Sequence, residues 1–300
     1  MKQPLILDGG MGRELARSGA PFRQPEWSAL ALIEAPEAVQ AVHASYIAAG
    51  AGVITTNSYA LVPFHIGEER FAREAKVLAD RAGRMARAVV AATGAGHVRV
   101  AGSLPPLFGS YRPDLFRSDD AARLLAPLVD GLSGHVDLWL AETLSATAEA
   151  RVVADMLAGD GRPLWLSFTL EDADDDAADL AQLRSGERVE DAVALALECG
   201  ARALLFNCSQ PEVMEAAVIR AVAERDRAGG KLLIGVYANA FPREPEAAPA
   251  NETISPIRDD LDPQRYLLWV RNWLRAGAGI VGGCCGIGPE HIAAIAADCA

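Results

Sequence analysis

The chain has 300 residues, a formal net charge of −12 and a sequence pI near 4.9. This acidic balance argues against a nucleic-acid partner, because affinity for phosphate backbones comes mainly from Lys and Arg side chains. No run reaches the roughly 18 apolar residues that a membrane span requires, and the first residues do not resemble a secretory signal. We therefore expect a cytoplasmic protein that binds neither nucleic acid nor membranes.

Short apolar runs alternate with longer helical patterns along the whole chain. The eight runs that we predict as strands are 5–8, 52–57, 98–103, 137–143, 163–169, 203–208, 232–239 and 279–284. They are almost continuously apolar, which is typical of parallel strands that are buried on both faces. The predicted sheet is therefore parallel, and the fold class is α/β.

Each predicted strand is followed by a helical pattern, and several of these patterns have Pro near the first turn or Gly just past the end. The main predicted helices are 36–49, 68–92, 119–134, 146–158, 189–199, 211–227, 263–276 and 289–297. Eight strands that alternate with helices predict a single (β/α)₈ TIM barrel over residues 1–300. A doubly wound open sheet is the alternative, but it typically has fewer strands, and the chain has no glycine-rich dinucleotide turn of the required spacing.

Three of the five cysteines follow predicted strands, and their number and spacing do not resemble a disulfide framework. Cys208 ends the sixth strand, and Cys284 and Cys285 end the eighth within a GGCCG run. Adjacent residues of a regular strand point to opposite faces, so this pair can share one ion only where the strand breaks into a turn, which the glycines permit. Catalytic zinc sites usually have three protein ligands and one open position. We predict that the three thiolates hold one Zn²⁺ that is open to a substrate thiol; three buried core cysteines are the alternative.

Other polar residues follow predicted strands at the face where barrel enzymes place their active sites. Asp8 and Gly9 follow the first strand, Tyr59 the second, and Glu142 and Asn207 end the fourth and the sixth. Each has a structural alternative: a turn residue for Asp8, a helix cap for Glu142, packing for Tyr59 and a strand-end turn for Asn207. Asn207 is otherwise expected to hydrogen-bond beside the metal ligand.

Two long connections, 104–118 and 241–261, are expected on the same face. Aromatic residues of the first, Phe108, Tyr111 and Phe116, either surround a cationic ligand or pack the loop. A third connection is acidic between Glu171 and Asp179, and we interpret it as a solvated loop rather than a Ca²⁺ site.

Six motifs resemble the homocysteine S-methyltransferase family, which includes betaine–homocysteine and S-methylmethionine–homocysteine methyltransferases. They are DGGMG (8–12), HASYIAAGA (43–51), ITTNSY (54–59), ET (142–143), FNCS (206–209) and GGCCG (282–286). The resemblance implies a (β/α)₈ barrel, a catalytic Zn²⁺ held by Cys208, Cys284 and Cys285, and homocysteine as the methyl acceptor.

The resemblance also implies roles for the other strand-end residues. Asp8 and Glu142 correspond to the carboxylates that bind homocysteine, with Glu142 the better candidate for its ammonium group, and Tyr59 corresponds to a position near the donor. Backbone N–H groups near Gly9 and Gly10 are expected to take the substrate carboxylate. Asn207 completes the predicted substrate-binding set.

The predicted reaction is zinc-dependent methyl transfer to the zinc-bound thiolate of homocysteine, which gives methionine. The donor is expected to be a sulfonium, S-methylmethionine or S-adenosylmethionine, or else betaine, and we favour a sulfonium. Transfer should be direct, because no cobalamin or folate domain is expected. The segment SLPPLFGSYRPDL, at 103–115, is longer than in many family members and leaves the donor open.

Two other functions stay open at this point. One is a barrel with a non-catalytic zinc site, and the other is a barrel lyase that uses Asp8 and Glu142 as acid and base. The sequence also leaves open whether the chain forms a homo-oligomer.

Overall fold

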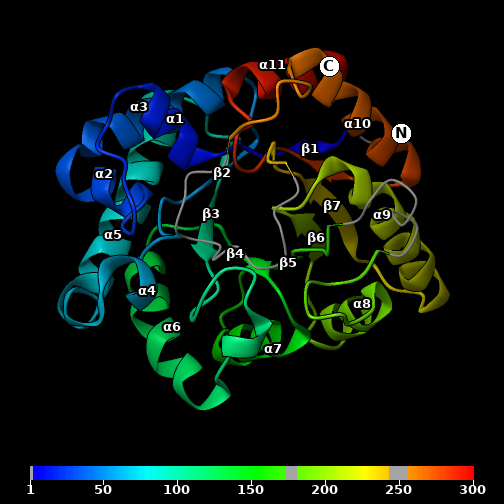
Figure 1. Ribbon diagram of the computed structural model, residues 1–300, viewed down its shortest axis with the longest axis horizontal. Coiled ribbons are helices and arrows are strands. Elements are labelled where there is room, and N and C mark those ends of the chain that lie inside the picture. Colours follow the sequence, from blue (N-terminus) through cyan, green and yellow to red (C-terminus); the bar gives the residue numbers. More distant parts are fainter. Residues whose placement is uncertain (1–2, 173–180, 243–255) are drawn as a thin grey trace.

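The computed structural model describes residues 3–172, 181–242 and 256–300. Its strands form one eight-stranded sheet in the order β1-β8-β7-β6-β5-β4-β3-β2, with helices around the outside (Figure 1). A parallel bridge between Leu7 and Val53 joins the two ends of this order. The sheet therefore closes into a barrel, and the prediction of a (β/α)₈ TIM barrel is confirmed.

Each of the eight predicted strands is present. The strands are β1 (Leu5–Ile6), β2 (Val53–Thr55), β3 (Arg99–Leu104), β4 (Leu138–Leu144), β5 (Leu164–Phe168), β6 (Ala203–Asn207), β7 (Leu233–Tyr237) and β8 (Ile280–Val281). All neighbouring strands pair in parallel. β1 and β8 are shorter than predicted, because the chain leaves the ladder before Asp8 and before Cys284 and turns toward the barrel mouth.

The eight predicted helices are also present. They are α3 (Pro36–Ala48), α5 (Glu68–Ala92), α6 (Ser118–Leu132), α7 (Thr147–Met156), α8 (Val189–Glu198), α9 (Pro211–Arg227), α10 (Pro263–Ala276) and α11 (Pro289–Asp298). Three further short helices, α1 (Met11–Arg17), α2 (Ser28–Glu34) and α4 (Pro63–Ile66), were not predicted from the sequence. They have 7, 7 and 4 residues, which is too short to show a helical period. In the described ranges, no helix is both long and apolar enough to cross a membrane.

The core has two parts, as the continuous apolar character of the strands predicted. A larger cluster lies between the strands and the helices. A smaller cluster fills the barrel interior, with Leu7, Val53, Leu140, Trp165, Leu205 and Ile280 among its members. Tyr237 belongs to the interior cluster, and Cys284 packs against it. The barrel is therefore a packed core with the thiols at its upper end.

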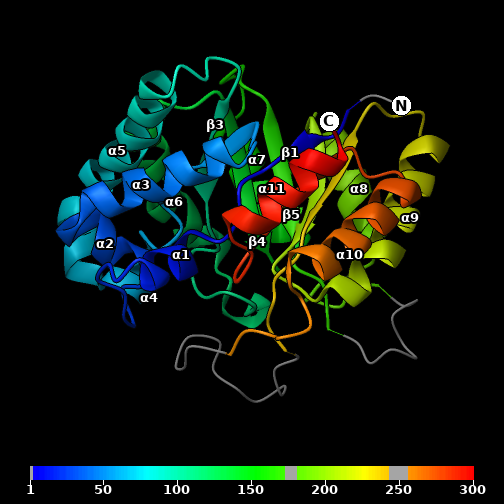
Figure 2. The same ribbon diagram turned by 90° about the horizontal axis from the view of Figure 1, so that it is seen from above.

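The two ends of the chain are neighbours in space. β1 pairs with β8, and α11 packs against β1 and α3 (Figures 1 and 2). Because barrel closure joins these elements, the loops after β1 and β8 lie side by side although almost the whole chain separates them.

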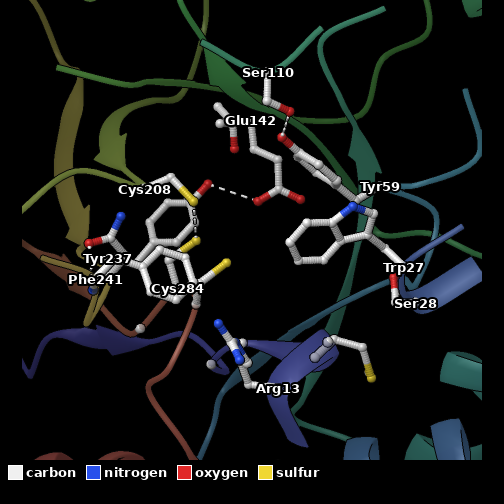
Figure 3. Close-up of a pocket in the computed structure, with 18 of the residues that line it drawn as sticks. Arg13, Trp27, Ser28, Tyr59, Ser110, Glu142, Cys208, Tyr237, Phe241 and Cys284 are labelled. Carbon is white, nitrogen blue, oxygen red and sulfur yellow. Dashed lines mark hydrogen bonds between the residues drawn. The ribbon is translucent and has the colours of Figure 1, made fainter. Parts of the chain in front are cut away.

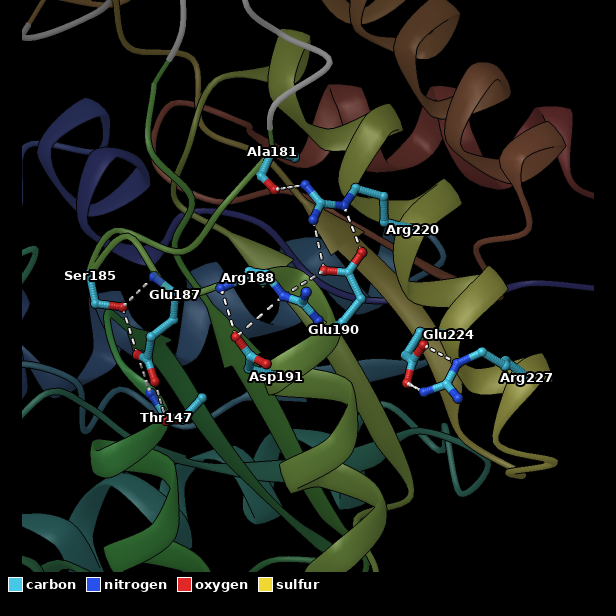
Figure 4. Close-up of polar contacts among 10 residues, drawn as sticks. All are labelled: Thr147, Ala181, Ser185, Glu187, Arg188, Glu190, Asp191, Arg220, Glu224 and Arg227. Carbon is cyan, nitrogen blue, oxygen red and sulfur yellow. Dashed lines mark hydrogen bonds and ion pairs between the residues drawn. The ribbon is translucent and has the colours of Figure 1, made fainter.

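Polar contacts tie helix α8 to helix α9 on the outside of the barrel (Figure 4). The Arg220 guanidinium donates to both carboxylate oxygens of Glu190, at 2.9 and 2.7 Å, and to the Ala181 carbonyl at 2.6 Å. About a quarter of each charged side chain is exposed. This partly buried, two-pronged pair is of the kind that contributes measurably to stability, unlike a single exposed ion pair.

We expect Arg220→Met to lower the free energy of unfolding by about 1–2 kcal/mol, since it removes both hydrogen bonds to Glu190 and the donor to the Ala181 carbonyl. A chain of this size should then lose roughly 2–6 °C in Tm, measured by circular dichroism. The control is Arg73→Met, which removes an exposed pair with Glu69. An equal fall in Tm for both variants would contradict the proposed role of the Arg220 contacts.

Candidate active site

A cavity of about 440 Å³ opens at the carboxyl ends of the strands. This volume is within the range of about 300–1,000 Å³ that is typical of small-molecule sites. Its lining includes the strand-end residues Asp8, Thr55, Glu142, Cys208, Tyr237, Cys284 and Cys285. Figure 3 shows the side chains of Cys208, Cys284, Glu142, Tyr237 and Tyr59 around this cavity. Barrel closure therefore brings most of the residues predicted from the sequence to one site.

The three strand-end cysteines converge. The Sγ atoms of Cys208, Cys284 and Cys285 all lie within 4.8 Å of one another. Cys208 and Cys284, 76 residues apart in the chain, are in hydrogen-bond contact at 2.7 Å between their sulfurs. Both are free thiols, and this contact is longer than the about 2.05 Å of a disulfide bond. Cys199 and Cys299 lie elsewhere, at the ends of helices α8 and α11.

The glycines around the cysteine pair act differently from our expectation. Of the three flanking glycines, only Gly286 has a positive φ, +85°, and so only this residue uses the conformational freedom of glycine. A Cβ on Gly282 would lie 2.5 Å from the Leu7 Cβ, and one on Gly283 would lie 2.1 Å from a methyl carbon of Ile287. Gly282 therefore lets the β8 loop pass close to the end of β1, and Gly283 lets the loop fold back onto Ile287.

The backbone at Cys208 also turns sharply where this residue joins the thiol cluster. Its φ is +52°, in the left-handed region that non-glycine residues rarely adopt. The other described non-glycine residues with positive φ are Trp27, Tyr111 and Thr143, and all four line the cavity. Such backbone strain is concentrated at functional sites, because the surrounding structure must stabilise it there.

The Glu142 carboxyl lies at the base of the cavity and is 8% exposed. It accepts hydrogen bonds from the Ser103 hydroxyl and, at 3.1 Å, from the Tyr237 hydroxyl. Burial raises the pKa of Glu142 to about 7, although these hydrogen bonds oppose the shift. A cationic partner beside this buried carboxyl would favour its ionised form and lower its pKa.

Asp8 lies on the same cavity wall and is 6% exposed. Its carboxylate accepts from the Thr55 backbone N–H at 2.7 Å and from the Thr55 hydroxyl at 3.0 Å. Burial raises the pKa of Asp8 to about 7, and the nearby Glu142 adds to the shift. Two buried carboxyls therefore face one small cavity.

Asn207 does not line the cavity. Its side-chain oxygen accepts from the Thr143 N–H at 3.0 Å and from the Ser167 hydroxyl at 2.7 Å, and its amide donates to the Thr143 hydroxyl at 2.9 Å. The residue is fully buried. These contacts support the positioning role that we considered, in which Asn207 joins the ends of β4, β5 and β6 beneath Cys208.

Gly9 lines the cavity where no side chain would fit, because a Cβ there would lie 2.2 Å from the Ile287 carbonyl oxygen. The N–H of the neighbouring Gly10 donates to the same carbonyl at 3.0 Å. The Gly10 N–H is therefore already used within the protein, and of this pair only the Gly9 N–H stays a prediction for carboxylate binding.

Tyr59 lines the cavity, and its hydroxyl is 2.7 Å from the Ser110 hydroxyl of the loop after β3. That loop also contributes Tyr111 to the lining. Phe108 and Phe116 pack against each other instead, with ring centroids 5.9 Å apart. They are not part of the cavity lining, so the cation-surrounding role considered for these two is not supported.

Several cavity residues were missed from the sequence, among them Arg13 and Trp27 (Figure 3). Arg13, in α1, lies over the Phe241 ring with its guanidinium carbon 5.2 Å from the ring centroid. Trp27 precedes α2. Both residues lie in or beside short helices that have no strong start signal in the sequence. A helix predicted directly after the DGG motif would have been the one indication for Arg13.

The acidic connection and the long loop after β7 are only partly described. Glu171 and Asp172 line the cavity, as do Phe241 and Pro242. The remaining predictions for these loops, at 173–180 and 243–255, lie outside the described residues.

Within the thiol cluster, the pKa values of Cys284 and Cys285 shift in opposite directions. Hydrogen bonds from Cys208 and Cys284, together with the positive charge of Arg13, lower the pKa of Cys285 well below its ordinary value. The same thiol contacts and burial raise the pKa of Cys284. One thiolate therefore disfavours ionisation of its neighbours, and a divalent cation is the group that would stabilise three thiolates together.

The donor set fits a metal ion that prefers sulfur. Three thiols at this separation are a soft donor set of the kind that binds zinc, and tetrahedral ligands with bonds of about 2.3 Å lie about 3.8 Å apart. The Cys208–Cys284 contact is shorter than this, so the two sulfurs would have to separate slightly. The prediction that the three cysteines could hold a metal is thus supported by their geometry.

The fold and the site together define a (β/α)₈ barrel with a metal-type thiol cluster and two buried carboxyls at its mouth. A family model described as homocysteine S-methyltransferase matches residues 5–299. The chain therefore belongs to the homocysteine S-methyltransferase family, and the predicted methyltransferase class is confirmed.

Relatives match along almost the whole chain. Homocysteine S-methyltransferase 4 of Zea mays is 30% identical, covering 97% of this chain and 88% of the relative. The homocysteine S-methyltransferase of Escherichia coli (strain K12) is 29% identical, covering 98% and 94%. The metallated form of the homocysteine methyltransferase MmuM from Escherichia coli superposes with a TM-score of 0.80 at 28% identity, covering 99% of this chain and 96% of that chain.

Proposed function

We propose that this protein transfers a methyl group directly from a sulfonium donor to the thiol of homocysteine, and that Cys208, Cys284 and Cys285 hold the Zn²⁺ required. The observation that carries the proposal is the convergence of three thiols beside two buried carboxyls in one cavity. In the reaction, the donor carbon–sulfur bond breaks and a bond from that carbon to the homocysteine sulfur forms. The donor leaves as a neutral thioether, and the thiol proton is released.

The metal would supply one chemical function. A Zn²⁺ ion with three thiolate ligands and an open position binds a further thiol and keeps it deprotonated near neutral pH.

The cavity carboxyls suit the ammonium group of the acceptor. Ser103 and Tyr237 orient the Glu142 carboxylate, and Thr55 orients that of Asp8. Because burial has raised both pKa values, an ammonium partner restores the charged form and gains more than it would at the surface. Arg13, in the same lining, supplies positive charge for the acceptor carboxylate.

The aromatic part of the cavity suits a sulfonium. Trp27, Tyr59, Tyr111, Tyr237 and Phe241 all contribute to the lining, and aromatic faces attract cations by their quadrupole. Catalysis then depends mainly on holding the donor methyl carbon in line with the acceptor sulfur, for which ordered walls are needed. The hydrogen bond between Tyr59 and Ser110 keeps one of these walls in place.

Metal analysis paired with a donor screen tests the proposal. We expect about one zinc per chain, and methionine formation from homocysteine with S-methylmethionine or S-adenosylmethionine. Zinc binding without transfer from any donor, betaine included, would favour a non-catalytic metal site. Full activity of a metal-free preparation would favour the barrel lyase or another metal-independent mechanism.

Homocysteine affinity should depend on pH through the buried carboxyls. Below a pKa of about 7, Glu142 is neutral and cannot pair with the ammonium, whereas above it the carboxylate is formed. We expect kcat/KM for homocysteine to rise as pH increases toward about 7, and this part of the rise should be missing in Glu142→Gln. Steady-state kinetics between pH 5.5 and 8.5 measure this, and an unchanged profile in the variant would contradict the assignment.

A further inference from the structure

A second charged group lines the cavity and has no role in acceptor binding or in the thiol cluster. Arg184 and Asp172 both belong to the lining and form an ion pair at 3.4 Å. Both follow β5, and their side chains are only 23% and 16% exposed. They are more accessible than Glu142 and Asp8, so they lie toward the open side of the cavity.

This pair is held loosely. Arg184 donates to the Asp172 carboxylate at 3.5 and 3.4 Å and to the Thr169 hydroxyl at 3.4 Å. A charge-assisted hydrogen bond normally measures about 2.7–2.9 Å. By comparison, Arg112 at the rim binds Asp114 with two bonds of 2.7 and 2.6 Å. The Arg184 guanidinium therefore retains much of its capacity to bind a second carboxylate.

Arg184 also contacts an aromatic residue of the cavity lining. The guanidinium carbon of Arg184 lies 5.2 Å from the centroid of the Tyr111 ring. Tyr111 and the cysteines of the thiol cluster line the same cavity. The charged pair and the thiol cluster therefore open onto one site.

The opposite charges of the pair match the two charges of an α-amino acid. A guanidinium binds a carboxylate and a neighbouring carboxylate binds an ammonium, so a zwitterion can replace the loose contact between Arg184 and Asp172 with two closer ones. Glu142, Asp8 and Arg13, which we propose bind the acceptor, line the same cavity. A second amino-acid subsite is needed only if the donor also carries an amino-acid end.

We propose that Arg184 and Asp172 bind the carboxylate and the ammonium of the methyl donor and so select sulfonium amino acids over donors without that end. The inference rests on the proposed methyl transfer. It assigns the donor specificity of the site to two residues of the β5 loop, and it leaves the acceptor site unchanged.

The test compares two donors that share the reacting sulfonium. S-Methylmethionine has the amino-acid end, and dimethylpropylsulfonium lacks it. In Arg184→Gln, we expect kcat/KM for S-methylmethionine to fall about 10–100-fold, since a partly buried charge-assisted contact is lost. The value for dimethylpropylsulfonium should stay within about twofold, and so should KM for homocysteine. Asp172→Asn should have the same donor-dependent effect, and Arg184→Lys should restore part of the loss because it keeps the charge but not the two-pronged geometry.

Calorimetric titration of S-methylmethionine supplies a readout that does not depend on turnover, and the Kd should increase in step with the kinetic loss. Arg73→Gln, a surface charge on α5, is the control for loss of one positive charge. An active wild type whose Arg184→Gln variant loses activity equally with both donors, or shows a raised KM for homocysteine, would overturn the inference alone. A wild type that transfers methyl from neither sulfonium would overturn the proposed function and this inference together.

Discussion

Cys208→Ala is expected to remove the bound metal and to lower methyl transfer by about a thousandfold or more. Two thiols remain, and they cannot complete the three-ligand set that a catalytic zinc site needs. Loss of the metal removes the means of keeping the acceptor thiol deprotonated, which is worth several kcal/mol in the transition state. Metal content by elemental analysis and methionine formation by chromatography measure the two effects, and Cys285→Ala should behave in the same way.

The fold should survive this substitution. β6 is paired along its length with β5 and β7, and Cys208 lies beyond the last of these pairs. Cys208 belongs to neither core cluster, so the circular-dichroism spectrum should be unchanged. Cys199→Ala is the matched control, because Cys199 is a half-buried free cysteine outside the site, and it should retain metal and activity. Loss of helicity in Cys208→Ala would show instead that the metal is structural.

Glu142→Gln is expected to lower kcat/KM for homocysteine by roughly 30–1,000-fold, with most of the change in KM. The substitution keeps the size of the side chain but removes the charge that pairs with the substrate ammonium. Losing one partner of a buried charge pair typically costs about 2–4 kcal/mol, because the remaining charge stays desolvated without compensation. Because this contact exists before and during methyl transfer, kcat should change less than KM.

Glu149→Gln is the control for this substitution. Glu149, in α7, is as buried as Glu142, at 7% exposed, but it does not line the cavity. Burial raises its pKa to about 8, so it is largely neutral at pH 7 and an amide resembles it closely. We expect its KM for homocysteine to stay within about twofold of the wild type. A similar increase of KM in both variants would mean that Glu142 acts through general stability rather than through the substrate.

The order and type of the main elements could be predicted because their signals are local. Continuous apolar runs such as 203–207 indicate buried parallel strands, and Pro211 and Pro263 mark helix starts. The short helices α1, α2 and α4 could not be predicted in this way. They are too short to show a helical period, and they are stabilised by packing against α3 and α5.

The candidate site, like the fold, could be predicted from the sequence only in part. The unusual CC pair within GGCCG and the strand-end positions of Asp8 and Glu142 were visible in the sequence and indicated thiol chemistry. The role of Asn207 could not be read from its position in the sequence. Its side-chain amide bonds to Thr143 and Ser167, and these contacts depend on the register of three neighbouring strands.

The sequence by itself therefore determined the barrel, the metal-type cysteines and the family, because periodicity and residue type record them directly. Only the tertiary structure decided that the Cys208 and Cys284 sulfurs are in contact and that Arg13 and Trp27 line the cavity. It also decided that Arg184 forms a long ion pair with Asp172 and lies over the Tyr111 ring. The physical reason is that these contacts join segments that only barrel closure brings together. Their distances depend on strand register and loop path, which no local pattern contains.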